Sequence, residues 1–356
     1  MTDVFDHAWL SGLFADAEMA ALWSSEAQLA GMRAFEVAWS RALGRAGIVD
    51  PSQAEAASQA IATMDFDLDD LREGTARDGV AVPRLVAQME AAAGQAKPAV
   101  HRGATSQDVI DTATALAMRD SLGLIDARLV SLTEAIDALD ARFGAASLIG
   151  RTRMQAATRI TAHDRIMPWS LPLADHRARL AELRPRVAKV QVGGASGDRR
   201  ALEEKAGDIA ADVAQALGLG DPPRTWHAMR DGVAEFASFL SLVTGTLGKM
   251  GQDIALMAQQ GISEIALAGG GGSSAMPHKQ NPILAELLVT LARFNAVQVS
   301  AVHQAMVHEQ ERSGAAWALE WMVLPQMAQA TGRSLQAGQA LIRQVTRIGS
   351  PAERPE

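Results

Sequence analysis

The chain has 356 residues, of which 48% are hydrophobic and 21% charged, as in ordinary soluble globular proteins with a sizeable core. Its net charge of −8 argues against nucleic acid or an anionic membrane surface as the main partner, since both require a cationic face. The absence of cysteine excludes a disulfide framework, a thiolate nucleophile and a cysteine metal site. The N-terminus is acidic, unlike a secretory signal, and no uninterrupted apolar run reaches membrane-spanning length, so we expect a cytoplasmic protein.

Residues 1–98 are expected to form a small helical N-terminal domain. Its helices should be short, because GIVDPS, DFDLDD, REG and KPAV interrupt the sequence. Strong helix formers abound throughout the chain, and alternating runs of β-branched residues are hard to find. The sequence therefore predicts an all-α fold.

Residues 99–349 are expected to form a central domain of long helices, followed by a tail at 350–356. Apolar residues recur at heptad spacing in two segments, Ser106 to Gly144 and Trp226 to Gly261. The two seams are Leu122, Ile125, Leu129, Leu132, Ile136, Leu139 and Phe143, and Phe236, Leu240, Val243, Leu247, Met250, Ile254 and Met257.

Further long helices are predicted from Pro282 to about His308 and from about Trp317 to Thr346, with Pro325 as a possible kink. A helix of roughly 35 residues extends about 50 Å and cannot bury its seam against a compact partner. We therefore expect an elongated bundle of nearly parallel helices that leaves apolar surface for other subunits.

Two polar segments precede or follow the first long helix. In HRGATSQDVID, residues 101–111, Thr105 or Ser106 can cap that helix, with Asp108 in its first turn. Capping does not account for His101 ahead of it, and a helix start with free hydroxyls also suits an anion. In GRTRMQAATRITAHDR, residues 150–165, several arginines form either a solvated basic face or an anion site.

Two more polar segments flank the second seam. In WHAMRDGVAEF, residues 226–236, we place His227, Arg230 and Asp231 on consecutive turns of one helix, as either surface charges or site residues. The segment LAGGGGSSAMPHKQNPILAE, residues 267–286, ends with Asn281 as a helix cap and Pro282 in the first turn. It lacks the P-loop pattern. Mobile glycines, hydroxyls and a lysine at a helix start are typical of a lid that closes over an anion.

The last segment resembles the Gly-Ser-Ser-x-Met-Pro-x-Lys-x-Asn-Pro signature of the fumarase/aspartase superfamily. The segments HRGATSQDVID, GRTRMQAA, VGGASG and WHAMRD agree in order and spacing. The resemblance implies a central helical domain that associates into a homotetramer, with active sites shared between subunits. Many members continue into a third helical domain, which we expect to be absent here because the chain stops at IGSPAERPE.

Within the superfamily, the sequence is most similar to bacterial 3-carboxy-cis,cis-muconate cycloisomerases of protocatechuate catabolism, the β-ketoadipate pathway. Lyases of the superfamily carry Thr-His where this chain has Thr152-Arg153. A permanent cation there suits a substrate with an extra carboxylate. The alternatives are a fumarate-releasing lyase, such as an adenylosuccinate or argininosuccinate lyase, and an inactive structural relative.

The resemblance also implies roles for individual residues, without a cofactor or a metal. Ser273, with Ser274 beside it, becomes the acid/base candidate, and Lys279 and Asn281 hold the carboxylate that becomes dianionic. The residues implied to bind the polycarboxylate substrate are His101, Thr105, Ser106, Thr152, Arg153, Gln155, Arg230, Met276 and His278.

Overall fold

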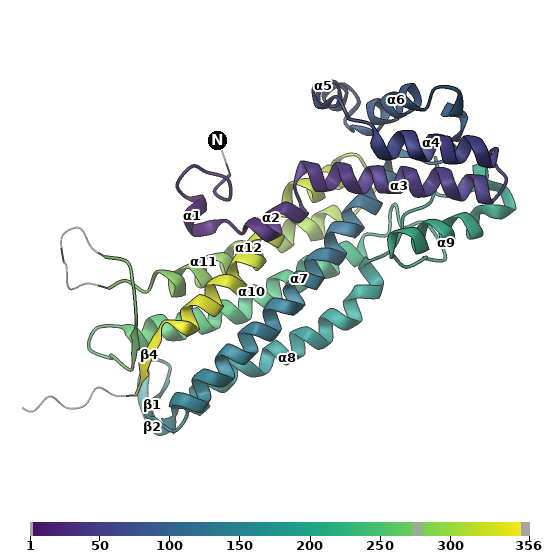
Figure 1. Ribbon diagram of the computed structural model, residues 1–356. Coiled ribbons are helices and arrows are strands. Elements are labelled where there is room, and N and C mark those ends of the chain that lie inside the picture. Colours follow the sequence, from purple (N-terminus) through teal and green to yellow (C-terminus); the bar gives the residue numbers. More distant parts are fainter. Residues whose placement is uncertain (1–2, 273–275, 277–279, 350–356) are drawn as a thin grey trace, which may run out of the picture.

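Most helices in the N-terminal part of the chain are short, as the sequence predicts, but one of them has 21 residues (Figure 1). The computed structural model describes residues 3–272, 276 and 280–349. The N-terminal helices are α1 (Ser11–Phe14), α2 (Ala17–Leu22), α3 (Ser25–Arg45), α4 (Pro51–Thr63), α5 (Leu68–Asp78), α6 (Val82–Ala93) and the 3-10 helix η1 (Gly94–Ala99). Local chemistry sets their ends. Ser24 accepts a 3.1 Å hydrogen bond from Ala27 N ahead of α3, and Gly79, with φ of 75°, closes α5.

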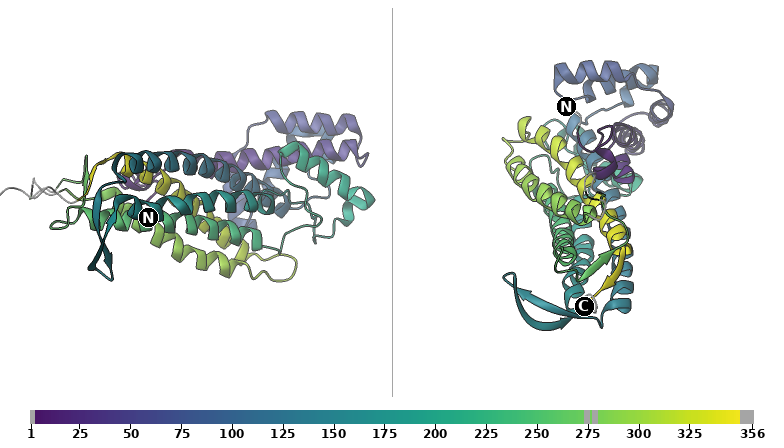
Figure 2. Two further views of the ribbon diagram at one scale, coloured as in Figure 1. Left: turned by 90° about the horizontal axis from the view of Figure 1, so that it is seen from below. Right: turned by 90° about the vertical axis from the view of Figure 1, so that its left-hand side faces the viewer.

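The central part forms an elongated bundle of long helices (Figures 1 and 2). The bundle helices are α7 (Ser106–Phe143), α8 (Ala162–Val187), α10 (Asp231–Ala258), α11 (Ile283–Ala305) and α12 (Ala315–Arg343), with η2 (Arg200–Lys205) and α9 (Ala206–Leu217) between α8 and α10 in sequence. Helix α12 continues through Pro325. The all-α class is confirmed. The domain boundary at residue 98 stays a prediction, because α3 packs on α7 as well as on α4.

Both heptad seams exist, but our argument that they need another subunit was wrong. The first seam is at most 5% exposed from Leu122 to Leu139 and becomes half-buried only at Phe143, and the second is buried throughout. The reason is that α7 packs on α8 and α12, and α10 on α8, α11 and α12. Several long helices of one chain bury each other's seams along their length. The predicted tetramer must therefore rest on other surfaces.

Short strands, which we did not anticipate, lie at the end of the bundle where α7 finishes. Within the described residues they form two antiparallel pairs: β1 (Ser147–Thr152) with β2 (Gln155–Thr161), and β3 (Ile265–Leu267) with β4 (Val345–Ile348). In the first pair, Ser147 lies opposite Thr161 and Thr152 opposite Gln155. The β1–β2 hairpin therefore carries the arginine-rich segment of the sequence.

Helix α11 is long and apolar enough, by length and composition, to cross a membrane. In this fold it packs along α10 and α12 as a helix of the bundle. Only 28% of its most apolar window is buried within the chain. Most of the exposed residues of α11 are polar or charged, and Val297 is its one exposed large apolar side chain.

Candidate active site

Asp108 organises the start of α7. Thr105 is the N-cap, and Asp108 Oδ2 accepts a 3.0 Å hydrogen bond from the Thr105 backbone N–H. The same carboxylate accepts hydrogen bonds from Gly193 N at 2.8 Å and Gly194 N at 2.9 Å, and from His227 Nε2 at 2.8 Å. The predicted cap is confirmed. Asp108 is also buried, and it fixes Gly193, Gly194 and His227 to this end of α7.

His227 and Arg230 do not lie on a helix, contrary to our prediction. Helix α10 begins at Asp231, and Arg230 is its N-cap. His227 is held ahead of the helix by Asp108, and Trp226 N donates a 2.8 Å hydrogen bond to Gln191 Oε1. These tertiary contacts give the 226–230 segment a turn conformation.

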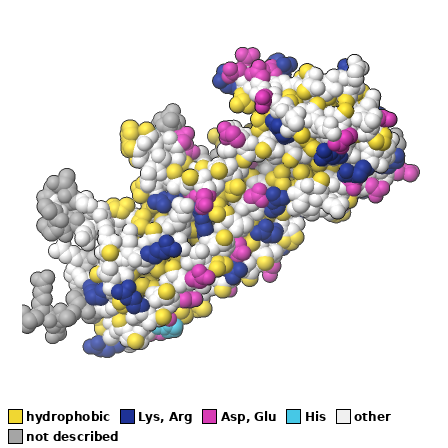
Figure 3. All heavy atoms as spheres, in the orientation of Figure 1, with side chains coloured by type: hydrophobic (Ala, Val, Ile, Leu, Met, Phe, Trp, Pro, Cys, Tyr) yellow, Lys and Arg dark blue, Asp and Glu magenta, His cyan; other side chains and the backbone are white. Residues whose placement is uncertain are grey.

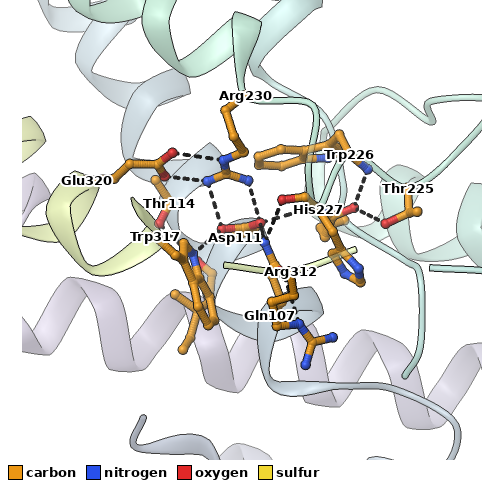
Figure 4. A network of polar contacts seen from close by, with 12 residues as sticks. Gln107, Asp111, Thr114, Thr225, Trp226, His227, Arg230, Arg312, Trp317 and Glu320 are labelled. Atoms are coloured by element: carbon orange, nitrogen blue, oxygen red, sulfur yellow. Dashed lines mark hydrogen bonds and ion pairs between the residues drawn. The ribbon is translucent and has the colours of Figure 1, made fainter. Parts of the chain in front are cut away.

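Arg230 forms a buried ion-pair network (Figure 4). Nη1 lies 2.7 Å from Asp111 Oδ2, and Nε donates a 2.9 Å hydrogen bond to Glu320 Oε1. Trp317 Nε1 donates a 2.9 Å hydrogen bond to Asp111 Oδ1, and the guanidinium lies 4.9 Å from the centroid of the Trp226 ring. The network joins α7, α10 and α12.

The surroundings of Arg230 set its charge. Burial alone lowers the pKa of Arg230, but the Asp111 and Glu320 carboxylates outweigh burial and hold the pKa above its ordinary value. Burial raises the pKa of Glu320 in spite of its ion pair with Arg230. Arg230 is 2% exposed, so it is not the surface charge that we considered. Contact of Arg230 with a substrate carboxylate stays a prediction, and it requires this network to open.

Sequence reasoning missed Arg312 and Gln107. Arg312 Nε donates a 3.0 Å hydrogen bond to Gln107 Oε1 (Figure 4). Arg312 Nη2 donates one of 3.2 Å to the Ala195 carbonyl. Gln107 in turn donates to Asp111 Oδ2 at 3.1 Å. The charged run HEQER between α11 and α12 was the available signal for Arg312. A partly exposed cation therefore contacts Gln107, the residue before Asp108 in sequence.

The hydroxyls of Thr105 and Ser106 lie at this same end of the bundle. Both side chains are half-buried, and neither hydroxyl donates a hydrogen bond to another described residue. His101 lies just before them in a turn, with φ of 51°. The structure thus brings His101, Thr105 and Ser106 together at the N-terminal end of α7, with Arg230 buried behind them.

Thr152, Arg153 and Gln155 lie on the β1–β2 hairpin, at the other end of α7. Arg153 and Met154, with φ of 49° and 67°, form the two-residue turn, and Thr152 pairs with Gln155 across it. All four residues are exposed, which fits the solvated-face alternative within one chain. Arg151 lies 2.6 Å from Glu264, which fixes the hairpin to the segment before β3.

The glycine-rich segment leaves the same end of the bundle. The backbones of Gly271 and Asn281 exchange two hydrogen bonds of 3.0 Å. The N-cap of α11 is Pro282, one residue later than we predicted. Of the remaining predicted loop residues, Met276 is 43% exposed, whereas Ser273, Ser274, His278 and Lys279 lie outside the described residues.

The predicted site residues that the structure describes therefore fall into two groups. His101, Thr105, Ser106 and Arg230 lie at the start of α7, and the β1–β2 hairpin and the described ends of the glycine-rich segment lie at the other end of the bundle (Figure 1). Helix α7 has 38 residues, which corresponds to about 57 Å of helix. Within one chain, the two groups cannot contact the same small molecule.

Comparison with known proteins identifies the family. A family model described as "Lyase" matches residues 10–299. The chain belongs to the fumarase/aspartase superfamily. The 3-carboxy-cis,cis-muconate cycloisomerase of Pseudomonas aeruginosa is 39% identical over 350 residues, which cover 96% of this chain and 76% of the relative. The 3-carboxy-cis,cis-muconate lactonizing enzyme of Pseudomonas putida superposes with a TM-score of 0.90 at 35% identity, over 96% of this chain and 77% of that one.

Superfamily members with other activities are also similar. A fumarate lyase structure from Mesorhizobium sp. BNC1 has a TM-score of 0.88 at 34% identity, covering 94% of this chain and 76% of that one. The N-acetyl-S-(2-succino)cysteine lyase of Enterococcus italicus is 31% identical over 91% of this chain and 72% of the relative. The superfamily assignment and its helical fold hold for this chain, and the particular reaction requires a separate argument.

Proposed function

We propose that this protein is a cycloisomerase that converts 3-carboxy-cis,cis-muconate to 4-carboxymuconolactone in the β-ketoadipate pathway. The observation that carries the proposal is the likeness to relatives of this name, up to 39% identical over 96% of the chain. Arg153 also supports the cycloisomerase proposal, because lyases of the superfamily have histidine at the corresponding position. An exposed arginine on a turn offers a planar pair of donors to a third carboxylate and cannot serve as a proton donor at neutral pH.

The reaction needs carboxylate binding and one proton. A substrate carboxylate oxygen adds to the diene and forms the lactone C–O bond, and the electron pair moves onto the carbon next to another carboxylate. That carboxylate spreads the charge, and the carbon takes up a proton. Ser273 is the candidate for this proton transfer, and Lys279 and Asn281 for stabilising the dianionic carboxylate. Thr105, Ser106, Thr152 and Gln155 supply hydrogen-bond donors to the remaining oxygens.

The site is proposed to assemble between subunits of a homotetramer. The support is the separation of the two groups of site residues by the length of α7. Apolar side chains also reach the surface along the bundle (Figure 3), and Val297 on α11 is 71% exposed. Sedimentation should give a tetramer at micromolar concentration, and a stable monomer would contradict shared sites.

Mixing two variants of strongly reduced activity tests the sharing directly. Ser106→Ala alters the start of α7, and Arg153→Ala alters the hairpin, so hybrid tetramers would contain some sites with neither change. Activity should reappear after the two variants are mixed and allowed to exchange subunits. If the mixture stays as inactive as its parents, each site draws both groups from the same chain or is not shared in this way.

The deciding experiment is an ultraviolet assay of the purified protein with 3-carboxy-cis,cis-muconate, followed by identification of the lactone. The second candidate is a fumarate-releasing lyase, favoured by the likeness to the fumarate lyase structure and the succinocysteine lyases. Release of fumarate from a succinyl substrate without lactone formation would select it. Inactivity on every substrate of both kinds would select the inactive relative.

A further inference from the structure

Helix α3 of the N-terminal region holds the segment just before α7 through three side chains on one face. Glu36 Oε1 lies 2.5 Å from His101 Nδ1, Trp39 Nε1 donates a 3.1 Å hydrogen bond to the Arg102 carbonyl, and Ser40 Oγ donates one of 2.9 Å to the Ala99 carbonyl. Positions 36, 39 and 40 are three or four residues apart, which places them on one side of a helix. The α3 helix thus fixes the backbone on both sides of His101.

His101 is held in a conformation that its residue type rarely adopts. Its φ of 51° is in the left-handed region, which persists in a non-glycine residue only where surrounding contacts enforce it. The side chain is 17% exposed, and Nδ1 faces Glu36. Among the described residues, Nε2 has no hydrogen-bond partner, yet it is not a buried unpaired atom. Nε2 is therefore the ring nitrogen that solvent or a ligand reaches.

Glu36 is a costly residue to bury. Its side chain is fully buried, its Oε1 contacts His101, and its Oε2 has no partner in the described part of the chain. A buried carboxylate is expensive unless a charged or hydrogen-bonding partner compensates it. The Ser40 and Trp39 contacts already fasten this segment to α3, so fastening alone does not account for a carboxylate here.

We propose that Glu36 is a positioning residue that fixes His101 Nδ1–H as its donor and so presents a protonated His101 Nε2–H to a carboxylate of the substrate. The inference rests on the proposed function, because it takes the ligand to be a polycarboxylate. It gives the N-terminal region a direct part in the active site: α3 supplies the charge that keeps the imidazole cationic.

The charges around His101 agree with this arrangement. Burial on its own lowers the pKa of His101, but the carboxylates of Glu36 on α3, Asp108 on α7 and Glu90 on α6 outweigh it, and the pKa is raised above its ordinary value. Glu36 makes the largest of these contributions and is the one in direct contact. Asp108 is already saturated by its own four donors.

The test compares wild type with Glu36→Gln, which keeps an acceptor for Nδ1–H and removes the charge. The full-length protein, with its 8 histidines labelled at Cε1, is titrated by NMR, and the His101 signal is assigned from its loss in a His101→Asn variant. We expect the His101 midpoint in Glu36→Gln to fall by about one to three pH units. Tricarballylate, a tricarboxylate that cannot cyclise, should bind about tenfold more weakly at pH 7.

Two matched controls separate charge from fastening. Ser40→Ala removes a buried hydrogen bond from the same helix face to the same segment without changing a charge. It should lower the melting temperature and leave the His101 midpoint in place. Glu90→Gln removes an exposed carboxylate that acts on His101 only through space, and its effect should be much smaller than that of Glu36→Gln.

The proposal is overturned if His101 titrates alike in wild type and Glu36→Gln, or if its midpoint falls while tricarballylate affinity is unchanged at every pH. If Glu36→Gln does not fold, Glu36→Asp retracts the charge by one methylene, and the midpoint and affinity must then still drop below wild type. Titration and binding as expected, without turnover of carboxymuconate, would reject the cycloisomerase assignment and retain the role of Glu36. Turnover of carboxymuconate, with a His101 midpoint that is unchanged in Glu36→Gln, would support the cycloisomerase assignment and reject the role of Glu36.

Discussion

His227 Nε2 donates a 2.8 Å hydrogen bond to Asp108 Oδ1, and the two buried side chains join the segment ahead of α10 to the start of α7. Because the same carboxylate also accepts from Gly193 N and Gly194 N, Asp108→Asn places an amide donor against a backbone or imidazole donor. We expect a loss of about 1–3 kcal/mol in the free energy of unfolding, measured in urea. Asp120→Asn, at a 44% exposed side chain on the same helix, is the control and should change stability by less than about 0.5 kcal/mol. If Asp108→Asn and Asp120→Asn lose the same free energy of unfolding, Asp108 does not act as an anchor.

Arg230→Met should be more damaging. It leaves the buried carboxylates of Asp111 and Glu320 without their cation, which costs about 3–5 kcal/mol at neutral pH. Burial raises the pKa of Glu320 even with Arg230 present, and removing the cation takes away the contact that opposes this rise. The variant should therefore regain stability relative to wild type as the pH falls and Glu320 becomes protonated. Arg186→Met, at the half-exposed pair with Glu235, should cost no more than about 1 kcal/mol. A pH-independent loss at Arg230 would point to lost packing.

The stability of the bundle should depend on His176 in mildly acid solution. Burial between α8 and α10, followed by the Arg179 cation, lowers the pKa of His176 from 6.5 to about 4. Between pH 6.5 and about 4, His176 is protonated in the unfolded chain and neutral in the folded chain. The free energy of unfolding therefore falls as the pH drops through this range. His176→Gln should remove that part of the fall. Parallel stability curves for variant and wild type from pH 7 to pH 4 would refute the assignment.

Ser273→Ala should nearly abolish turnover of carboxymuconate and leave the binding of tricarballylate largely intact. The reason is that the serine is proposed to act on a proton and not to hold the substrate in its ground state. The comparison needs kcat and a separately measured dissociation constant. Turnover at the wild-type rate would move the proton transfer to another group, with Ser274 or His101 next in line.

Arg153→His tests the residue that separates the cycloisomerase assignment from the lyases. If Arg153 forms a buried contact with a substrate carboxylate in the assembled site, its loss costs on the order of 2–5 kcal/mol, hence at least about tenfold in kcat/KM. Histidine tolerates the left-handed backbone of this turn better than most residues, so assembly should be unaffected.

The matched control for Arg153 is Arg159→His, at another exposed arginine of the same hairpin. It should leave kcat/KM close to the wild-type value. If kcat/KM of Arg153→His also equals the wild-type value, Arg153 is part of a solvated basic face. The cycloisomerase assignment then loses its best support from a single residue.

The long helices and the cap at Thr105 follow from the sequence, because periodicity and capping act over a few residues. The burial of the seams within one chain does not. Heptad spacing shows that Leu129 or Val243 faces a helix, but not whether that helix comes from the same chain or another. Length alone therefore misled us about why subunits should associate.

Contacts between distant segments explain the other errors. Arg230 looked like a helix-surface charge, because Asp111 and Glu320 lie 119 and 90 residues away in sequence. The β1–β2 hairpin escaped notice because half of β1 and nearly all of β2 are exposed, so no continuous buried face imposes an alternating pattern. The sequence around Glu36 did not indicate a site residue, because its proposed role depends on contact with His101, 65 residues later.

The Asp111 network also sets an order in time. Asp111 receives Arg230 from 119 residues downstream and Trp317 from 206 residues downstream. Its cation and its indole donor are both present only once α12 has been synthesised and docked. Closing loops of this length precedes any gain from the contacts they bring together, which slows the final step. Trp317 is one of 7 tryptophans in the chain. In a variant that keeps Trp317 alone, we expect its fluorescence to change when a refolding chain completes the bundle.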